Sequence, residues 1–237
     1  MSVSTEASLA KLFRLLDGSV GVLMQHNGRD KAMSAVYYSL LFCAGRINCA
    51  NTTDKLMTLA KQFSSARIIL RRFNDLPLIG ANFIHFIHPP SDENDRICYD
   101  LQTAINVLYT IYSPIEHVAW LSDLKLLPFN ASKWSKYSLF VWTSSLILSI
   151  VRSALLLLRM QVESKTFEEE DARKRLADKK KEELLNILSF SLDFLNAVNF
   201  LPYKGFFWAQ SFPLWTTGLF GFLASCINLI KLYRAVK

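Results

Sequence analysis

The sequence predicts an all-α integral membrane protein with amphipathic helices in its N-terminal half and two main apolar spans. The 237 residues are 51% hydrophobic and only 20% charged, and the mean hydropathy is +0.19, a balance that suits lipid better than water. Apolar residues recur at helical spacing in the first half of the chain. Two long stretches in the second half carry almost no charge.

The formal net charge of +7 is concentrated at the two ends of the chain. Basic ends suit an anionic surface, either a membrane leaflet or nucleic acid, and the apolar composition favours the membrane. The four cysteines form no CxxC pair and no Cys/His cluster, which excludes a disulfide scaffold. We therefore expect anionic membrane lipids as a partner, and we expect no cofactor and no metal site.

Residues 1–75 form the first predicted region, which consists of basic amphipathic helices. Its sharpest pattern runs over residues 53–73, where apolar residues recur every three or four positions. We predict that this helix binds one leaflet through its apolar stripe and its cations. The alternative is a helix packed on the protein's own core. The predicted membrane-binding residues are Lys55, Leu56, Leu59, Lys61, Phe63, Arg67, Leu70, Arg71, Arg72 and Phe73.

Residues 76–136 form the second region, which we interpret as interfacial or membrane-associated helices. Its first part, residues 76–91, has no charged side chain but contains three prolines and one glycine. This part is too short and too broken to span a bilayer, so it predicts an interfacial or re-entrant turn. His85 and His88 lie three residues apart, but no carboxylate or cysteine at ligand spacing accompanies them.

Two segments carry the transmembrane prediction. The first, residues 137–158, reaches the roughly 20 residues that a bilayer requires, and Arg152 interrupts it. A central arginine costs about 2.5 to 3.5 kcal/mol, so Arg152 should face a bundle interior, line a pore, or reach toward the interface. The second span, residues 205–230, is uncharged, and the basic tail, residues 231–237, closes it like an interfacial anchor.

A charged helical connector, residues 159–204, separates the two spans, and its acid-first charge pairs predict a solvated helix. In the second span, Gly218, Gly221 and Ser225 form a small-residue face that permits close helix approach. We expect this face to pack on another helix, either in the same chain or in a second copy. The second alternative would make the protein a homo-oligomer.

The sequence contains no P-loop, GxGxxG, GxSxG or HExxH motif and no polar cluster suited to catalysis. We therefore predict no catalytic residue and no enzymatic activity. The basic helix lacks any signature of RNA or DNA recognition, so nucleic acid is not an expected partner. Two alternatives stay open: a pore for small solutes, supported by Arg152, and a multi-pass enzyme of lipid metabolism.

Several short motifs follow one another in order between Gly28 and Tyr233. They are Gly28-Arg29-Asp30-Lys31, Ser64-Ser65-Ala66-Arg67 leading into Leu70-Arg71-Arg72, Glu116-His117-Val118-Ala119-Trp120, Trp134 with Trp142 and Arg152, Asn196-Ala197-Val198-Asn199-Phe200-Leu201-Pro202, and Gly218-Leu219-Phe220-Gly221. Together they resemble the peroxin-eleven family of peroxisomal membrane proteins, most closely its gamma type.

The resemblance implies a multi-pass protein of the peroxisomal membrane with both termini in the cytosol. It implies that the protein elongates and proliferates peroxisomes ahead of fission and that it self-associates. It also implies partners among other family members, or fission adaptors with a dynamin-like GTPase. Members of the family have been proposed to form pores for small metabolites, which adds support to the alternative that Arg152 lines a pore.

Overall fold

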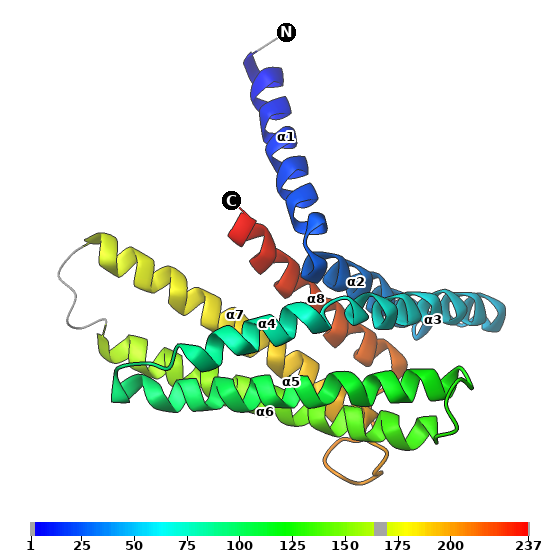
Figure 1. The fold of residues 1–237 in the computed structure, drawn as a ribbon. Helices are drawn as coiled ribbons and strands as arrows, with labels where there is room; N and C mark the ends of the chain where they lie inside the picture. Colours follow the sequence, from blue (N-terminus) through cyan, green and yellow to red (C-terminus); the bar gives the residue numbers. More distant parts are fainter. Residues whose placement is uncertain (1–2, 164–169, 237) are drawn as a thin grey trace.

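The structure, a computed structural model, describes residues 3–163 and 170–236. Within these ranges the chain forms eight helices and no strand (Figure 1), which confirms the all-α prediction. The helices are α1 Val3–Met24, α2 His26–Ala44, α3 Ala50–Arg72, α4 Asp75–Ile87, α5 Glu93–Asp123, α6 Ala131–Glu163, α7 Glu170–Phe200 and α8 Leu214–Val236.

Consecutive helices from α4 to α8 pack as neighbours, as sequential elements usually do. In Figure 1, α5 and α6 lie side by side below α4, α7 passes behind them, and most of α8 lies above them. The N-terminal helices contact this bundle through α2, which packs on α8 and on α3. Helix α1 projects away from the bundle and contacts the end of α8.

Two helices, α6 and α8, are long and apolar enough to cross a membrane, as predicted. The second span begins later than predicted, at Leu214. Residues 201–213 form turns, and φ is positive at Gly205 (93°), Phe207 (49°) and Gln210 (59°). Because a right-handed helix requires negative φ, the helix cannot extend back to residue 205. Most of the predicted basic tail lies inside α8.

Residues 76–91 also differ from the prediction, because most of them belong to helix α4 and do not form a turn. Pro77 is tolerated because it stands in the first turn, where a backbone N–H has no intrahelical acceptor. Of the predicted connector, residues 164–169 lie outside the described residues. From Glu170 onward the connector is helix α7, as its charge pattern predicts.

The exterior of the bundle is apolar, whereas much of its interior is polar. On α6, Phe140 is 64% exposed and Leu158 is 59% exposed, while most buried side chains carry hydroxyl groups. Ser149, for example, donates to the carbonyl of Ser145 at 2.7 Å. Hydroxyls that bond their own helix allow close helix packing in lipid, so this distribution suits a membrane. The buried hydroxyl residues of α6 are Ser138, Thr143, Ser145, Ser149 and Ser153.

Helix α8 packs on α2 through the small-residue face that the sequence predicts. A Cβ at Gly218 would lie 2.3 Å from a backbone nitrogen of α2, and one at Gly221 would lie 2.3 Å from the ring of Tyr38. Ser225 donates to the hydroxyl of Ser34 at 2.9 Å. Because α2 fills this face, it is not available to a second copy of the chain.

We predict that Gly218→Ala lowers the free energy of unfolding by about 1 to 3 kcal/mol, because the added methyl group would meet the backbone of Phe42. Thermal unfolding of the detergent-purified chain, followed by circular dichroism, measures the effect. Gly80→Ala is the matched control, since no heavy atom lies within 4 Å of a Cβ there and alanine favours a helix. A Gly218→Ala variant as stable as the wild type would contradict this packing.

Candidate functional site

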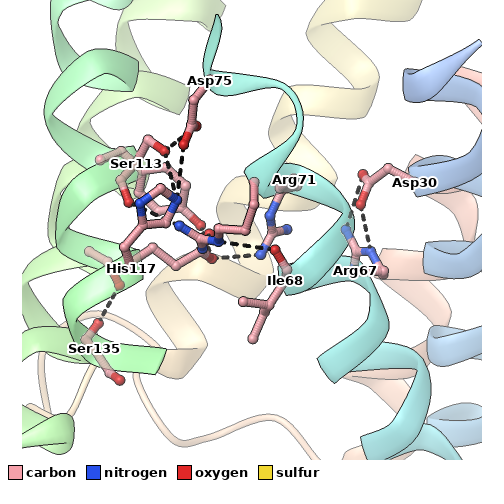
Figure 2. A network of polar contacts seen from close by, with 12 residues as sticks. Asp30, Arg67, Ile68, Arg71, Asp75, Ser113, His117 and Ser135 are labelled. Atoms are coloured by element: carbon pink, nitrogen blue, oxygen red, sulfur yellow. Dashed lines mark hydrogen bonds and ion pairs between the residues drawn. The ribbon is translucent and has the colours of Figure 1, made fainter. Parts of the chain in front are cut away.

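Polar side chains from α2, α3, α4 and α5 meet inside the bundle, on the two sides of α3 (Figure 2). We call this region the arginine network. Burying a polar group costs free energy unless the group is hydrogen-bonded or paired. The contacts of each member therefore determine how well it tolerates burial. The ionisable members of the arginine network are Asp30, Arg67, Arg71, Arg72, Asp75, Glu116 and His117.

On one side of α3, Arg67 pairs with Asp30 of α2. Its Nε donates to Oδ1 at 3.0 Å and its Nη2 donates to Oδ2 at 3.4 Å, so the planar guanidinium meets both carboxylate oxygens. The two side chains are only 14% and 11% exposed. This ion pair therefore fixes how α3 is rotated against α2.

On the other side of α3, Glu116 of α5 accepts hydrogen bonds from two arginines. Arg71 Nη2 lies 2.6 Å from Oε1, and Arg72 Nη2 lies 2.9 Å from Oε2. The side chain of Glu116 is 14% exposed, and the hydroxyl of Tyr112 also donates to Oε1. One carboxylate thus holds the C-terminal end of α3 against α5.

Asp75, the first residue of α4, extends the arginine network to the next helix. Its Oδ1 accepts from the hydroxyl of Ser113, and its Oδ2 lies 3.1 Å from Nε2 of His117. A carboxylate in the first turn also suits the positive end of the helix dipole. Because α4 follows α3 almost directly, these contacts set the direction in which the chain leaves α3.

Two carboxylates in this part of the bundle differ in the direction of their pKa shifts. Burial acts to raise the pKa of Asp30, but Arg67, Lys31 and Arg71 outweigh it and the pKa is lowered. The Asp30 carboxylate therefore stabilises the fold above the ordinary carboxyl pKa, and this contribution is lost as pH falls through the lowered value. Burial raises the pKa of Asp193 in α7, although Lys31 and Arg67 oppose it.

The placement of Arg67, Arg71 and Arg72 does not fit the leaflet-facing role predicted for them. Each guanidinium is engaged by a carboxylate inside the bundle, so these cations are not free to meet lipid headgroups. The exposed side of α3 is polar over most of its N-terminal half, at Asp54, Lys55, Thr58, Lys61 and Gln62. It also carries Leu59 and Ile69, each 47% exposed, and Phe73 directly after the helix is 76% exposed. The helix is amphipathic as predicted, but its arginines point inward.

The remaining residues of the predicted membrane-binding set divide between the surface and the interior. Lys55 and Lys61 are exposed, whereas Leu56, Phe63 and Leu70 are partly buried. Contact of these residues with lipid stays a prediction. The exposed cations of α3 are therefore lysines near its N-terminal end, while the exposed aromatic ring of Phe73 follows its C-terminal end.

Helix α4 contacts α5 through polar groups and exposes its apolar ones. Asn82 is 8% exposed and donates from Nδ2 to the hydroxyl of Thr110 at 2.8 Å. His85 forms a 2.8 Å hydrogen bond with a threonine of α5. Leu76 and Phe83 of the same helix are 78% and 65% exposed. This pattern is the reverse of the one that a surface helix shows in water.

The two histidines of this segment have hydrogen-bond partners. His85 bonds Thr103 and stacks on the ring of Tyr99, with a centroid separation of 4.2 Å. His88 bonds the backbone carbonyl of Ile84 at 3.0 Å. In the part of the chain that the structure describes, no group of three or more His, Cys, Asp or Glu side chains is placed to hold a metal ion.

Arg152 lies on α6, apart from the arginine network. Its Nε is buried and has no hydrogen-bond partner, and its neighbours Ser149 and Ser153 are buried as well. Across residues 3–163 and 170–236, no ion pair or hydrogen bond links Arg152 to the arginine network. The buried Nε favours a bundle interior over a position at the interface.

The partners of the α3 arginines could not be inferred from helical spacing. Asp30 is 37 residues from Arg67, and Glu116 is 45 residues from Arg71. One feature of the sequence pointed to these partners: each carboxylate lies in one of the short motifs that carry the family resemblance. These motifs are distant in sequence and adjacent in space, which indicates that they form one structural unit.

We predict that Arg67→Leu lowers the free energy of unfolding by about 3 kcal/mol, since it leaves the buried Asp30 carboxylate without its main partner. The double variant Arg67→Leu with Asp30→Leu should recover most of this loss, because no buried charge is then left unpaired. Thermal or chemical unfolding in detergent measures both.

Asp178→Asn provides the control for this prediction, because the Lys181–Asp178 pair is 67% exposed on each side and exposed pairs contribute about 1 kcal/mol or less. If Arg67→Leu changed stability no more than Asp178→Asn, the ion pair would not be holding α3 on α2.

Comparison with known proteins places the whole of this arrangement in one family. The model of the family Peroxisomal biogenesis factor 11 (PEX11) matches residues 16–233. Peroxisomal membrane protein 11C of Homo sapiens is 30% identical over 232 residues, which cover 93% of this chain and 95% of the relative.

The protein of the same name from Mus musculus is 30% identical over 233 residues, with the same coverage of both chains. No solved structure matches the chain. The match spans all the helices that build the arginine network, the whole of α6 and all but the last three residues of α8. The chain therefore belongs to the PEX11 family of peroxisomal biogenesis factors, whose members are peroxisomal membrane proteins.

Proposed function

We propose that the chain elongates and proliferates the peroxisomal membrane ahead of fission by inserting apolar side chains of α3 and α4 into one leaflet. The family supplies the role in peroxisome biogenesis. The observation that supports the mechanism is the exposed apolar surface of these two helices over an interior in which the arginines are paired. The exposed residues concerned are Leu59, Ile69, Phe73, Leu76, Ile79, Phe83, Ile84, Phe86 and Ile87.

The length of α4 restricts it to one side of the membrane. Its 13 residues extend about 20 Å at 1.5 Å per residue, which is less than the roughly 30 Å hydrocarbon core. An apolar helix of this length fits along the leaflet, where it increases the area of that leaflet relative to the other. An imbalance of this kind favours curvature, as for other amphipathic helices that lie in the interface.

The free energy of insertion has an apolar and an electrostatic part. Apolar surface gains about 25 cal/mol per Å² removed from water, so an exposed ring such as Phe73 contributes substantially. Lys55 and Lys61 are exposed and would each add about 1 kcal/mol on an anionic leaflet. The ion pairs of Arg67, Arg71 and Arg72 allow α3 to approach lipid without unpaired guanidinium groups.

The proposal includes self-association in the peroxisomal membrane, with both termini in the cytosol. Since α2 occupies the Gly218 and Gly221 face, a second copy would use another surface. Through its family the chain is expected to work with other members, or with fission adaptors and a dynamin-like GTPase. In this scheme the chain supplies membrane deformation and has no catalytic step of its own.

We predict that Leu59→Glu combined with Phe73→Glu abolishes tubulation of anionic liposomes by the reconstituted full chain, because two carboxylates would then have to enter the leaflet. Electron microscopy of the liposomes counts tubules. Gln62→Glu, an exposed position on the same helix, adds negative charge without replacing an apolar residue and should keep most tubulation. Equal tubule counts for the double variant and the wild type would reject leaflet insertion by α3.

A pore for small metabolites is the second candidate function, and the observation that favours it is the cation Arg152 within the apolar helix α6. If Arg152 lines a pore, Arg152→Leu should alter anion over cation selectivity in planar bilayers, because a fixed positive charge favours anions. Arg152→Lys keeps the charge and should keep the selectivity. Unchanged selectivity in Arg152→Leu, or no conductance in the wild type, would remove the pore from consideration.

A further inference from the structure

Two hollows meet at Arg234, in the last turn of α8. The first is apolar, has a volume of about 560 Å³ and lies between α1, α2 and α8. The second is charged, has a volume of about 480 Å³ and lies between α7 and α8. Both volumes lie within the range of small-molecule sites in proteins. Arg234 lines both.

The apolar hollow is built from residues of three helices. Val22 and Leu23 of α1, together with Leu229 and Ile230 of α8, provide most of its wall. The approach of α1 to α8 is close, because a Cβ at Gly18 would lie 2.4 Å from the ring of Tyr233. The hollow is therefore a product of the packing of α1 on the end of α8.

The charged hollow has an excess of cations. Lys179, Lys181, Lys231 and Arg234 line it, against the carboxylates of Asp178 and Glu182. The Lys181–Asp178 pair, at 3.4 Å, is largely exposed, and the ammonium of Lys231 donates to the side-chain oxygen of Asn186. An anion entering this hollow would meet two basic residues of α8 and two of α7.

Both hollows adjoin the last turns of α8 and share Arg234, so one apolar and one charged environment lie next to each other there, as the two parts of a phospholipid require. Helix α8 is apolar enough to cross a membrane, and its basic residues lie in its last turns, where span and headgroup region meet. The charged part of α7 beside it suits water. The apolar hollow also reaches Leu229 and Ile230, further from the end of α8.

We propose that the two hollows form one binding site for a single anionic phospholipid of the surrounding leaflet. Its phosphate lies in the charged hollow, one acyl chain lies in the apolar hollow, and Arg234 binds the phosphate at the junction. A guanidinium offers a planar pair of donors that suits phosphate oxygens. The site depends on the chain's place in the membrane and not on insertion of α3 and α4, so either idea can fail without the other.

A simpler role for Arg234 and Lys231 is to complement the negative end of the α8 dipole. That role requires no apolar hollow beside them, and it would not distinguish one lipid from another. Retention of a specific lipid class by the purified chain therefore separates the two explanations.

Native mass spectrometry of the full-length protein, extracted from bilayers of dioleoyl phosphatidic acid and dioleoyl phosphatidylcholine, tests the proposal. We expect one retained phosphatidic acid per chain, with retention about tenfold lower in Arg234→Gln and partly restored in Arg234→Lys, which keeps the charge but not the planar pair of donors. Lys136→Gln, which removes an exposed cation from α6, should retain the lipid as the wild type does. Equal retention of both lipids, or equal retention by Arg234→Gln and wild type, would overturn the site.

The apolar half of the site has its own test. Leu23→Asp places a charge in the apolar hollow and should reduce retention of phosphatidic acid about as much as Arg234→Gln does. The thermal unfolding temperature of the variant checks that it folds. Glycerol 3-phosphate, which has the phosphate but no acyl chain, should fail to displace the lipid. Displacement by glycerol 3-phosphate would show that only the charged hollow binds and would overturn the two-part site.

Discussion

The ion pairs between the arginines of α3 and the carboxylates of α2 and α5 are the interactions on which the rest of the arrangement depends. Three guanidinium groups next to lipid would be unfavourable unless paired, and Asp30 and Glu116 pair with them inside the bundle. This pairing orients α3 so that Leu59 and Phe73 remain outside. The orientation of α4 follows, because Asp75 bonds α5 directly after α3 ends.

The other helices of the bundle also keep polar side chains inside and apolar side chains outside. Buried hydroxyls on α6 bond backbone carbonyls of their own helix, while Phe140 and Leu158 face outward. At the far end of α7, Asn196 and Asn199 are buried and donate to the backbone carbonyl and the hydroxyl of Thr217. Most buried polar groups thus have partners inside the protein, because lipid provides none. Among the described residues, the buried side-chain atoms without a partner are Arg71 Nε, Arg152 Nε and Asn196 Oδ1.

This distribution is the basis of the membrane remodelling that we propose. An apolar exterior on α6 and α8 suits spanning helices, whereas the short α4 exposes its apolar face without the length to cross a bilayer. A protein that is anchored by its spans and adds helix volume to one leaflet can act on curvature without any chemical step. The two hollows around Arg234 would place a separate lipid contact at the C-terminal end of α8, where α1 packs on it.

The helical class, the two apolar spans and the amphipathic character of residues 53–73 could be predicted from the sequence, because hydrophobic period and span length are local properties. The packing face of Gly218, Gly221 and Ser225 could be predicted as well. The packing of the bundle was needed to show that α2 covers that face and that Arg67 turns inward to Asp30. Periodicity separates two faces of a helix but does not state which one meets the interior, and in lipid the apolar face can be the outer one. The pairing partner of an arginine is equally invisible to local spacing, since packing of the bundle alone brings Asp30 and Glu116 to α3.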